Sequence, residues 1–187
     1  MDTIINISIF VITGLSFSAC FRKEGRWDLQ KGLKSLRFFT ILSNLFCAVS
    51  ALLLVLSSSQ WAWLLKYVGT VAVTITLLTV LFFLGPNMGY KQMFSGKDLY
   101  LHLCGPLMAI LSFCFMERWY ALSFPLSLLG ILPVIIYGFV YLFEVVILKN
   151  WEDFYGYNKD GKWKLSMAAM FAGGFAVCML IRILYYI

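Results

Sequence analysis

The chain has 187 residues, of which 61% are hydrophobic and only 13% are charged. A soluble domain usually carries about twice that share of charged residues, so this composition predicts an integral membrane protein. The net charge of +6 does not indicate nucleic acid as a partner, because the basic residues flank the apolar runs, as is typical of membrane proteins. The length suits a single transmembrane helical domain that covers residues 1–187.

A membrane-spanning helix requires about 20 apolar residues, and six runs in the chain approach that length. We therefore predict an all-α fold, a polytopic membrane protein built as a six-transmembrane-helix bundle. The first run follows Asp2 rather than a basic segment, so we interpret it as a retained span and not as a cleaved signal peptide. The six predicted spans are Thr3–Phe21, Leu36–Ser57, Trp61–Leu84, Leu99–Phe115, Leu122–Leu148 and Leu165–Ile187.

Basic residues gather in alternate connections between these spans. The first, third and fifth loops with their flanks hold 12 of the 15 Lys and Arg residues. The positive-inside rule then predicts that these loops are cytoplasmic and that both termini lie outside. We expect the protein in the cell membrane of a bacterium-like cell. The first loop, residues 22–35, is expected to be a solvated connection that sets topology. The alternative is an amphipathic segment that rests on anionic lipid.

The second span carries a polar stripe near its start. Arg37, Thr40 and Asn44 fall at i, i+3 and i+7, so they share one face of a helix, and Ser43 lies beside them. Lipid offers such groups no partners, so we expect them to find partners inside the protein. The simpler alternative is that the Thr40 hydroxyl bonds back to the carbonyl of Leu36.

Other polar residues are expected at the same depth. His102, the sole histidine, lies one turn inside the fourth span, and Pro106 follows it and frees a backbone carbonyl. Tyr141 and Glu144 share a face near the cytoplasmic end of the fifth span, and Glu144 is the one acid well inside an apolar run. The distribution of charges and the lengths of the runs place Thr40, His102 and Glu144 in one layer of the bilayer.

These residue types are typical of a nucleophile and its base. A hydroxyl such as that of Thr40 becomes nucleophilic when a neighbouring base takes its proton, and a neutral imidazole is suited to that task. Glu144 or a freed carbonyl would orient the second ring nitrogen of His102. Backbone N–H groups inside a helix are already bonded, so we expect an oxyanion donor from the Asn44 amide. The candidate substrate-binding residues are Arg37, which would attract a carboxylate head group, Ser43, Asn44, Tyr141 and Glu144.

Two segments resemble a known family. Arg37–Leu45 is similar to the aromatic-Thr-x-x-Ser-Asn segment of the androgen-induced-gene family of membrane hydrolases, and Leu101–Pro106 is similar to that family's histidine-containing helix. Members of the family split fatty acid esters of hydroxy fatty acids. The resemblance covers the second to fifth spans and implies a multi-span esterase with Thr40 as nucleophile and His102 as its partner. The fifth loop, residues 149–163, matches no segment of the family.

Several alternatives stay open. A transporter or channel component is a second class, although the chain shows no inverted repeat and few charged residues at mid-membrane. A non-catalytic membrane scaffold is a third class. The aromatic fifth loop fits either an interfacial belt or a lid over a site. The five cysteines are scattered without a CxxC pair, so we expect no metal site and no cofactor. Gly85-Pro86-Asn87 is expected to end the third span.

Overall fold

The apolar runs form six long helical segments in the computed structural model, which describes residues 1–187. Each segment is long and apolar enough to cross a membrane. The predicted all-α bundle of six spans is thereby confirmed, and the chain is a multi-pass membrane protein that contacts the lipid bilayer. The segments are Asp2–Cys20, Phe39–Leu56, Gln60–Met88, Lys97–Phe115, Phe124–Ile147 and Trp163–Tyr186.

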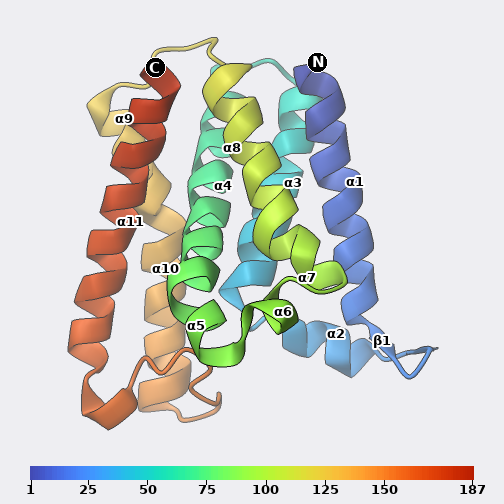
Figure 1. Ribbon diagram of the computed structural model, residues 1–187. Coiled ribbons are helices and arrows are strands. Elements are labelled where there is room, and N and C mark those ends of the chain that lie inside the picture. The colour runs from blue at the N-terminus through green and yellow to red at the C-terminus, as the bar shows by residue number, and fades with distance from the viewer.

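One helix, α4, lies at the centre of the bundle. It packs against α3 and α8 on one side and against α10 and α11 on the other, while α1 covers α3 and α8 (Figure 1). The core around α4 is aromatic, with Trp63, Tyr67 and Phe113 almost fully buried. The long helices are α1 (Asp2–Cys20), α3 (Phe39–Leu56), α4 (Gln60–Thr79), α8 (Gly105–Phe115), α10 (Leu132–Tyr141) and α11 (Trp163–Tyr186).

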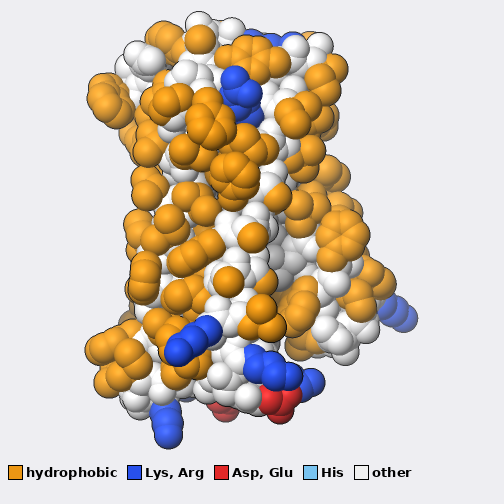
Figure 2. All heavy atoms as spheres, turned by 90° about the vertical axis from the view of Figure 1, so that its left-hand side faces the viewer, with side chains coloured by type: hydrophobic (Ala, Val, Ile, Leu, Met, Phe, Trp, Pro, Cys, Tyr) orange, Lys and Arg blue, Asp and Glu red, His pale blue; other side chains and the backbone are white.

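The connections at the two ends of the bundle differ. Both termini lie at one end, together with α9 (Phe124–Leu128) and η3 (Leu129–Ile131) (Figure 1). The basic loops lie at the opposite end, where Lys and Arg side chains gather below a band of hydrophobic ones (Figure 2). Which end faces the cytoplasm stays a prediction from the charges. The short elements at the basic end are β1 (Arg22–Lys23), β2 (Arg26–Trp27), α2 (Leu29–Ser35), α5 (Gly85–Met88), α6 (Tyr90–Met93), α7 (Lys97–Leu99) and η5 (Lys159–Gly161).

Two Gly-Pro pairs widen their helices instead of ending them. Each pair follows a π-helical stretch, η1 (Val80–Leu84) or η2 (Tyr100–Cys104), and each glycine N–H donates to the carbonyl five residues back. The third span therefore continues as far as Met88, beyond the predicted end at Leu84, and the prediction that Gly85-Pro86-Asn87 ends it there is wrong. A proline ring crowds the preceding turn of an α-helix, and a wider turn makes room for it.

Each proline also leaves one backbone carbonyl without its donor. In the five-residue register, the Leu81 carbonyl would pair with residue 86 and the Leu101 carbonyl with residue 106, and proline has no N–H. Side chains replace both donors. The Tyr90 hydroxyl donates to the Leu81 carbonyl at 2.8 Å, and the Asn44 amide donates to the Leu101 carbonyl at 2.9 Å. The freed carbonyl predicted beside Pro106 is thus present and already paired.

A buried ion pair joins three spans near the end that carries the termini. Lys66 on α4 and Glu117, just beyond α8, are fully buried, with the ammonium 3.4 Å from Oε1 of the carboxylate. Asn6 on α1 accepts a hydrogen bond from Lys66 and donates one to Glu117 at 2.7 Å. Ser112 accepts a further bond from Lys66 at 3.0 Å. These contacts connect α1, α4 and α8 through fully buried side chains.

Candidate active site

Thr40 lies in the first turn of its helix and not in the middle. The chain is extended at Phe38, with φ −89° and ψ 130°, so α3 begins at Phe39, three residues after the predicted start at Leu36. The Thr40 N–H donates to no backbone carbonyl. The Leu36 carbonyl accepts no hydrogen bond from the Thr40 hydroxyl, and the Thr40 carbonyl itself accepts one from Ser43. The expectation that the helix around Thr40 lacks free N–H donors is therefore wrong, because first-turn N–H groups have no carbonyl four residues back.

His102 is held by a backbone carbonyl. It lies in the π-helical stretch η2, is 8% exposed, and has its Nδ1 2.7 Å from the carbonyl oxygen of Met93 at the end of α6. A carbonyl only accepts, so Nδ1 carries a proton, and in a neutral ring the lone pair is then on Nε2. Neither predicted orienting group holds the ring: the carbonyl freed by Pro106, that of Leu101, is paired with Asn44, and Glu144 accepts from Asn150.

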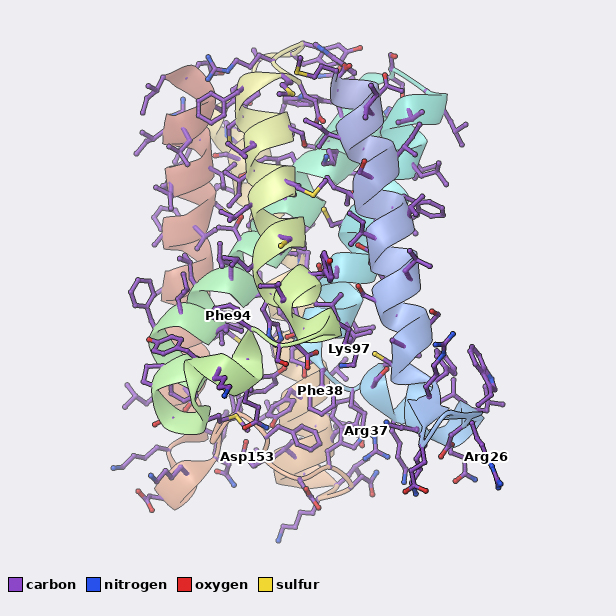
Figure 3. All side chains as sticks on the ribbon, turned by 45° about the vertical axis from the view of Figure 1, so that its right-hand side comes forward. Arg26, Arg37, Phe38, Phe94, Lys97 and Asp153 are labelled. Carbon is purple, nitrogen blue, oxygen red and sulfur yellow. The ribbon has the colours of Figure 1, made fainter.

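Thr40 and His102 line one cavity of about 580 Å³ at the basic end of the bundle. Three lysines also line it: Lys31 and Lys34 on α2, and Lys97 on α7. Lys97 and Phe38, another lining residue, are both visible at this end in Figure 3. We call this space the basic cavity. Loop charge was the only sequence signal for these lysines, and the prediction gave the anion-binding role to Arg37 instead.

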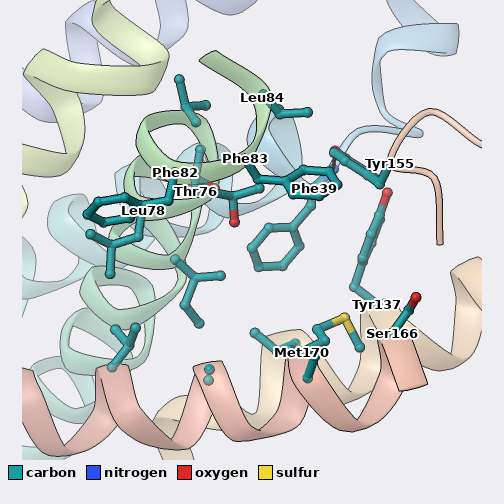
Figure 4. Close-up of a pocket in the computed structure, with 18 of the residues that line it drawn as sticks. Phe39, Thr76, Leu78, Phe82, Phe83, Leu84, Tyr137, Tyr155, Ser166 and Met170 are labelled. Carbon is teal, nitrogen blue, oxygen red and sulfur yellow. Dashed lines mark hydrogen bonds between the residues drawn. The ribbon is translucent and has the colours of Figure 1, made fainter. Parts of the chain in front are cut away.

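A second cavity, of about 650 Å³, meets the first at Thr40. It lies between α4–η1 on one side and α10 and α11 on the other, with Phe39 reaching into it (Figure 4). Most of its lining side chains are hydrophobic, among them Phe82, Tyr137 and Met170. We call it the apolar cavity. Thr40, Leu84 and Tyr155 line both cavities, so these three residues form the boundary between them.

The fifth loop places Tyr155 at this boundary. The Asp153 carboxylate accepts hydrogen bonds from the Tyr141 hydroxyl at 3.1 Å and from the Tyr157 N–H at 2.8 Å, which fastens the loop to α10. The Phe39 N–H donates to the Tyr155 hydroxyl at 3.2 Å. Burial raises the pKa of the Tyr155 phenol, and the Phe39 N–H and the side chains of Tyr137 and Thr40 lower it in part. These contacts hold the loop against α10 and the start of α3, and both the interfacial belt and the lid stay predictions.

Asn44 cannot serve as the predicted oxyanion donor in this geometry. Its amide nitrogen donates to the Thr40 carbonyl at 2.8 Å and to the Leu101 carbonyl at 2.9 Å, so both of its protons are engaged. Asn44 lines neither cavity. Its position one turn beyond Thr40 on the same helix face is as predicted, but the side chain turns toward η2 because the Leu101 carbonyl needs a donor there.

Three of the other predicted substrate-binding residues, Ser43, Arg37 and Tyr141, lie in three different environments. Ser43 is buried, and its hydroxyl lies 2.9 Å from that of Thr76. The Arg37 guanidinium lies 5.7 Å from the centre of the Trp151 ring and lines neither cavity. Tyr141 lines the apolar cavity.

Glu144 does not line a cavity with Thr40 and His102. Its carboxylate accepts a hydrogen bond from Asn150 at 3.1 Å and lines neither cavity. Residues 142–147 form the π-helical stretch η4 (Leu142–Ile147), which turns less per residue than an α-helix. The α-helical spacing that predicted a shared face with Tyr141 therefore fails at Glu144.

Thr40 and His102 thus line one cavity, Thr40 also lines the apolar cavity, and the Thr40 N–H donates to no backbone carbonyl. The chain was also compared with known proteins. No protein-family model, no curated protein and no solved structure matches it. The resemblance to the androgen-induced-gene family therefore depends on the segments around Thr40 and His102 and stays a prediction.

Proposed function

We propose that this protein is an intramembrane hydrolase of fatty-acyl esters, with Thr40 as nucleophile and His102 as general base. One observation carries the proposal. Thr40 lines both the basic cavity, which it shares with His102, and the apolar cavity. In this proposal, the acyl chain of a lipid ester meets its polar portion beside Thr40. An apolar space of about 650 Å³ is within the range of known small-molecule sites.

The reaction follows the pattern of serine hydrolases. Nε2 of His102 takes the proton of the Thr40 hydroxyl as Oγ1 attacks the ester carbonyl carbon. The tetrahedral intermediate collapses, the alcohol leaves with that proton, and the acyl group stays on Thr40. Water then attacks the acyl carbonyl while His102 again takes a proton. The fatty acid is released, and the Thr40 hydroxyl is restored.

The start of α3 supplies the stabilisation that the intermediate needs. The Thr40 N–H is free, and it belongs to the first turn of a helix of 18 residues. N–H groups at this position carry the positive end of the helix dipole. A backbone N–H of the nucleophile itself is a known oxyanion donor in serine proteases. This donor replaces Asn44 in the role that the sequence suggested.

The basic cavity indicates the chemistry of the alcohol portion. Lys31, Lys34 and Lys97 line it, with Asp98 as the one acid among its lining residues. We expect an ester whose alcohol carries an anionic group, as in a fatty acid ester of a hydroxy fatty acid. The lysines would bind the anionic group, and the acyl chain would occupy the apolar cavity. The predicted topology places this site near the cytoplasmic leaflet.

Hydrolysis of a fluorogenic long-chain ester of 4-methylumbelliferone by the purified full-length protein tests the proposal. Thr40→Ala and His102→Asn are each expected to lower the rate by roughly 10³-fold or more. Asparagine places its amide nitrogen near the position of Nδ1, so it keeps the bond to Met93 and removes only the base. Thr74→Ala is the control, because that hydroxyl donates to the Thr70 carbonyl in its own helix and lines neither cavity.

Wild-type activity that survives Thr40→Ala would overturn the proposal. So would an inactive wild-type protein that carries solute across liposome membranes and keeps doing so in both variants, a result that supports the transporter alternative. Either result is compatible with the fold.

A glycine on α11 tests the place of the acyl chain. Gly173 lines the apolar cavity, and a Cβ built on it meets no atom within 4 Å. Gly173→Phe is therefore expected to fit and to fill part of the cavity, so hydrolysis of long acyl chains falls while that of butyrate esters persists. Gly14→Phe is the matched control, because Gly14 is exposed on α1 and is equally unobstructed. An unchanged chain-length preference in Gly173→Phe would place the acyl chain elsewhere.

A further inference from the structure

The first basic loop is an ordered hairpin and not an irregular connection. β1 and β2 pair antiparallel, with Arg22 opposite Trp27 and Lys23 opposite Arg26. Glu24 and Gly25 join them with φ of +50° and +79°. Two successive residues at positive φ are the signature of a type I′ turn, which matches the twist of a two-stranded hairpin. The hairpin therefore holds its side chains in a fixed arrangement.

That arrangement leaves three cations without an ion-pair partner, although Glu24 and Asp28 lie in the same segment. Lys23 and Arg26 face each other directly across the hairpin, and like charges at such a position destabilise it. Arg22, Lys23 and Arg26 are exposed, and none of them has an acidic partner, since all four ion pairs of the protein lie elsewhere. An anion bound between the two cations would remove the repulsion.

Large hydrophobic side chains are exposed beside these cations. Trp27 stacks on Phe21 at 4.9 Å between ring centres and is still 65% exposed. Leu29 and Leu33, one turn apart on α2, are 59% and 53% exposed. The Lys31 ammonium donates to the Arg22 carbonyl at 2.7 Å and fastens α2 to the hairpin. Cations beside exposed Trp and Leu are the pattern of a segment that lies at the membrane interface.

The position of the hairpin agrees with this pattern. It projects sideways from the foot of α1, beyond the outline of the bundle (Figure 1), and Arg26 lies at its outer edge (Figure 3). Because the bundle spans the bilayer, a projection at this level extends over the head groups of adjacent lipids. We propose that residues 22–35 bind anionic phospholipid, with Lys23 and Arg26 on the phosphate and with Trp27, Leu29 and Leu33 at the interface. The binding does not require the proposed hydrolysis.

Native mass spectrometry of the full-length protein tests this, in detergent micelles that contain phosphatidylglycerol or phosphatidylcholine. The wild-type protein is expected to retain phosphatidylglycerol with an apparent affinity about tenfold or more above that for phosphatidylcholine. Lys23→Gln/Arg26→Gln should abolish that preference. Both positions are exposed, so the double variant is expected to keep the wild-type size-exclusion profile.

The matched control is Lys149→Gln/Lys159→Gln, which removes two exposed positive charges at the same end of the bundle but on the fifth loop. It should keep the preference for phosphatidylglycerol. The proposal is overturned if both double variants lose the preference equally, or if the wild-type protein has none. Neither outcome bears on ester hydrolysis, because no substituted residue lines either cavity.

Discussion

The Asn44 amide holds two backbone carbonyls, those of Thr40 and Leu101, at 2.8 and 2.9 Å. Thr40, one turn earlier, makes no such bond and faces the cavities. The sequence predicts that both residues lie on one helix face, and it predicts their depth. It does not separate their roles, because the difference depends on where α3 begins and on the carbonyl that Pro106 leaves free on another helix.

Asn44→Ala should therefore lower stability more than it lowers catalysis. The substitution leaves the Leu101 carbonyl unpaired in a buried position, at a cost of about 1–3 kcal/mol in the free energy of unfolding. Unfolding by SDS titration measures it. Asn87→Ala is the control, because that amide also donates to a backbone carbonyl, that of Phe83 at 2.7 Å, but is exposed. An Asn44→Ala protein of wild-type stability and greatly reduced turnover would restore the oxyanion role.

Tyr155 is expected to make the stability of the folded protein fall with pH in the alkaline range. Burial raises the pKa of its phenol in the folded protein, whereas an unfolded tyrosine titrates near pH 10. Above that pH the unfolded chain loses this proton first, so this contribution to stability is full below about pH 10 and is lost as pH rises further. Tyr155→Phe should flatten the decline of the unfolding midpoint above pH 10, and Tyr100→Phe, at an exposed position, should not. Equal slopes in both variants would contradict a buried phenol.

The two Gly-Pro helices show what sequence patterns miss at the scale of the element. The sequence predicts that Pro106 frees a carbonyl. It predicts neither the π-helical stretch nor that Asn44 on α3 donates to the freed carbonyl. An α-helical spacing is also assumed when Tyr141 and Glu144 are placed on one face, and η4 changes that spacing. The length of an apolar run predicts that a helix forms. The direction in which one of its side chains points also depends on whether the turns are α-helical or π-helical, and the apolar run does not show this.

A double-mutant cycle tests the account of η2. Pro106→Ala supplies the N–H that the Leu101 carbonyl lacks, so Asn44→Ala should cost less in that background. The expected coupling in the free energy of unfolding is about 0.5–3 kcal/mol. The control cycle pairs Asn44→Ala with Pro86→Ala, because the Leu81 carbonyl has its own donor in Tyr90. If the first cycle is additive within error, Asn44 does not substitute for the missing proline donor.

For the whole molecule, six spans and the gathering of basic residues at one end were predictable from length, hydropathy and charge. The buried pair of Lys66 and Glu117 was not identified, although a lysine inside a predicted span was a signal for it. The partners of Lys66 could not be predicted from the sequence, because Asn6, Ser112 and Glu117 meet it only when α1, α4 and α8 assemble.

Lys66→Met should destabilise the bundle by about 3–5 kcal/mol, since it leaves the Glu117 carboxylate buried and unpaired. Lys66→Met/Glu117→Gln should recover at least half of that loss, because no unpaired charge remains. Lys162→Met removes an exposed pair, 4.0 Å from Asp160, and should change stability by no more than about 1 kcal/mol. SDS titration distinguishes the three variants. A single variant as stable as the wild type would mean that the pair does not hold the three spans together.

The most direct measurement is the site at which a fluorophosphonate probe modifies the wild-type protein, mapped by tandem mass spectrometry of the digested chain. Thr40 and His102 line one cavity, and the contact of His102 Nδ1 with the Met93 carbonyl leaves Nε2 of a neutral ring as the proton acceptor. We predict a phosphonyl adduct on Thr40 that disappears in His102→Asn. An adduct on another side chain, or labelling that Thr40→Ala leaves undiminished, would contradict the account.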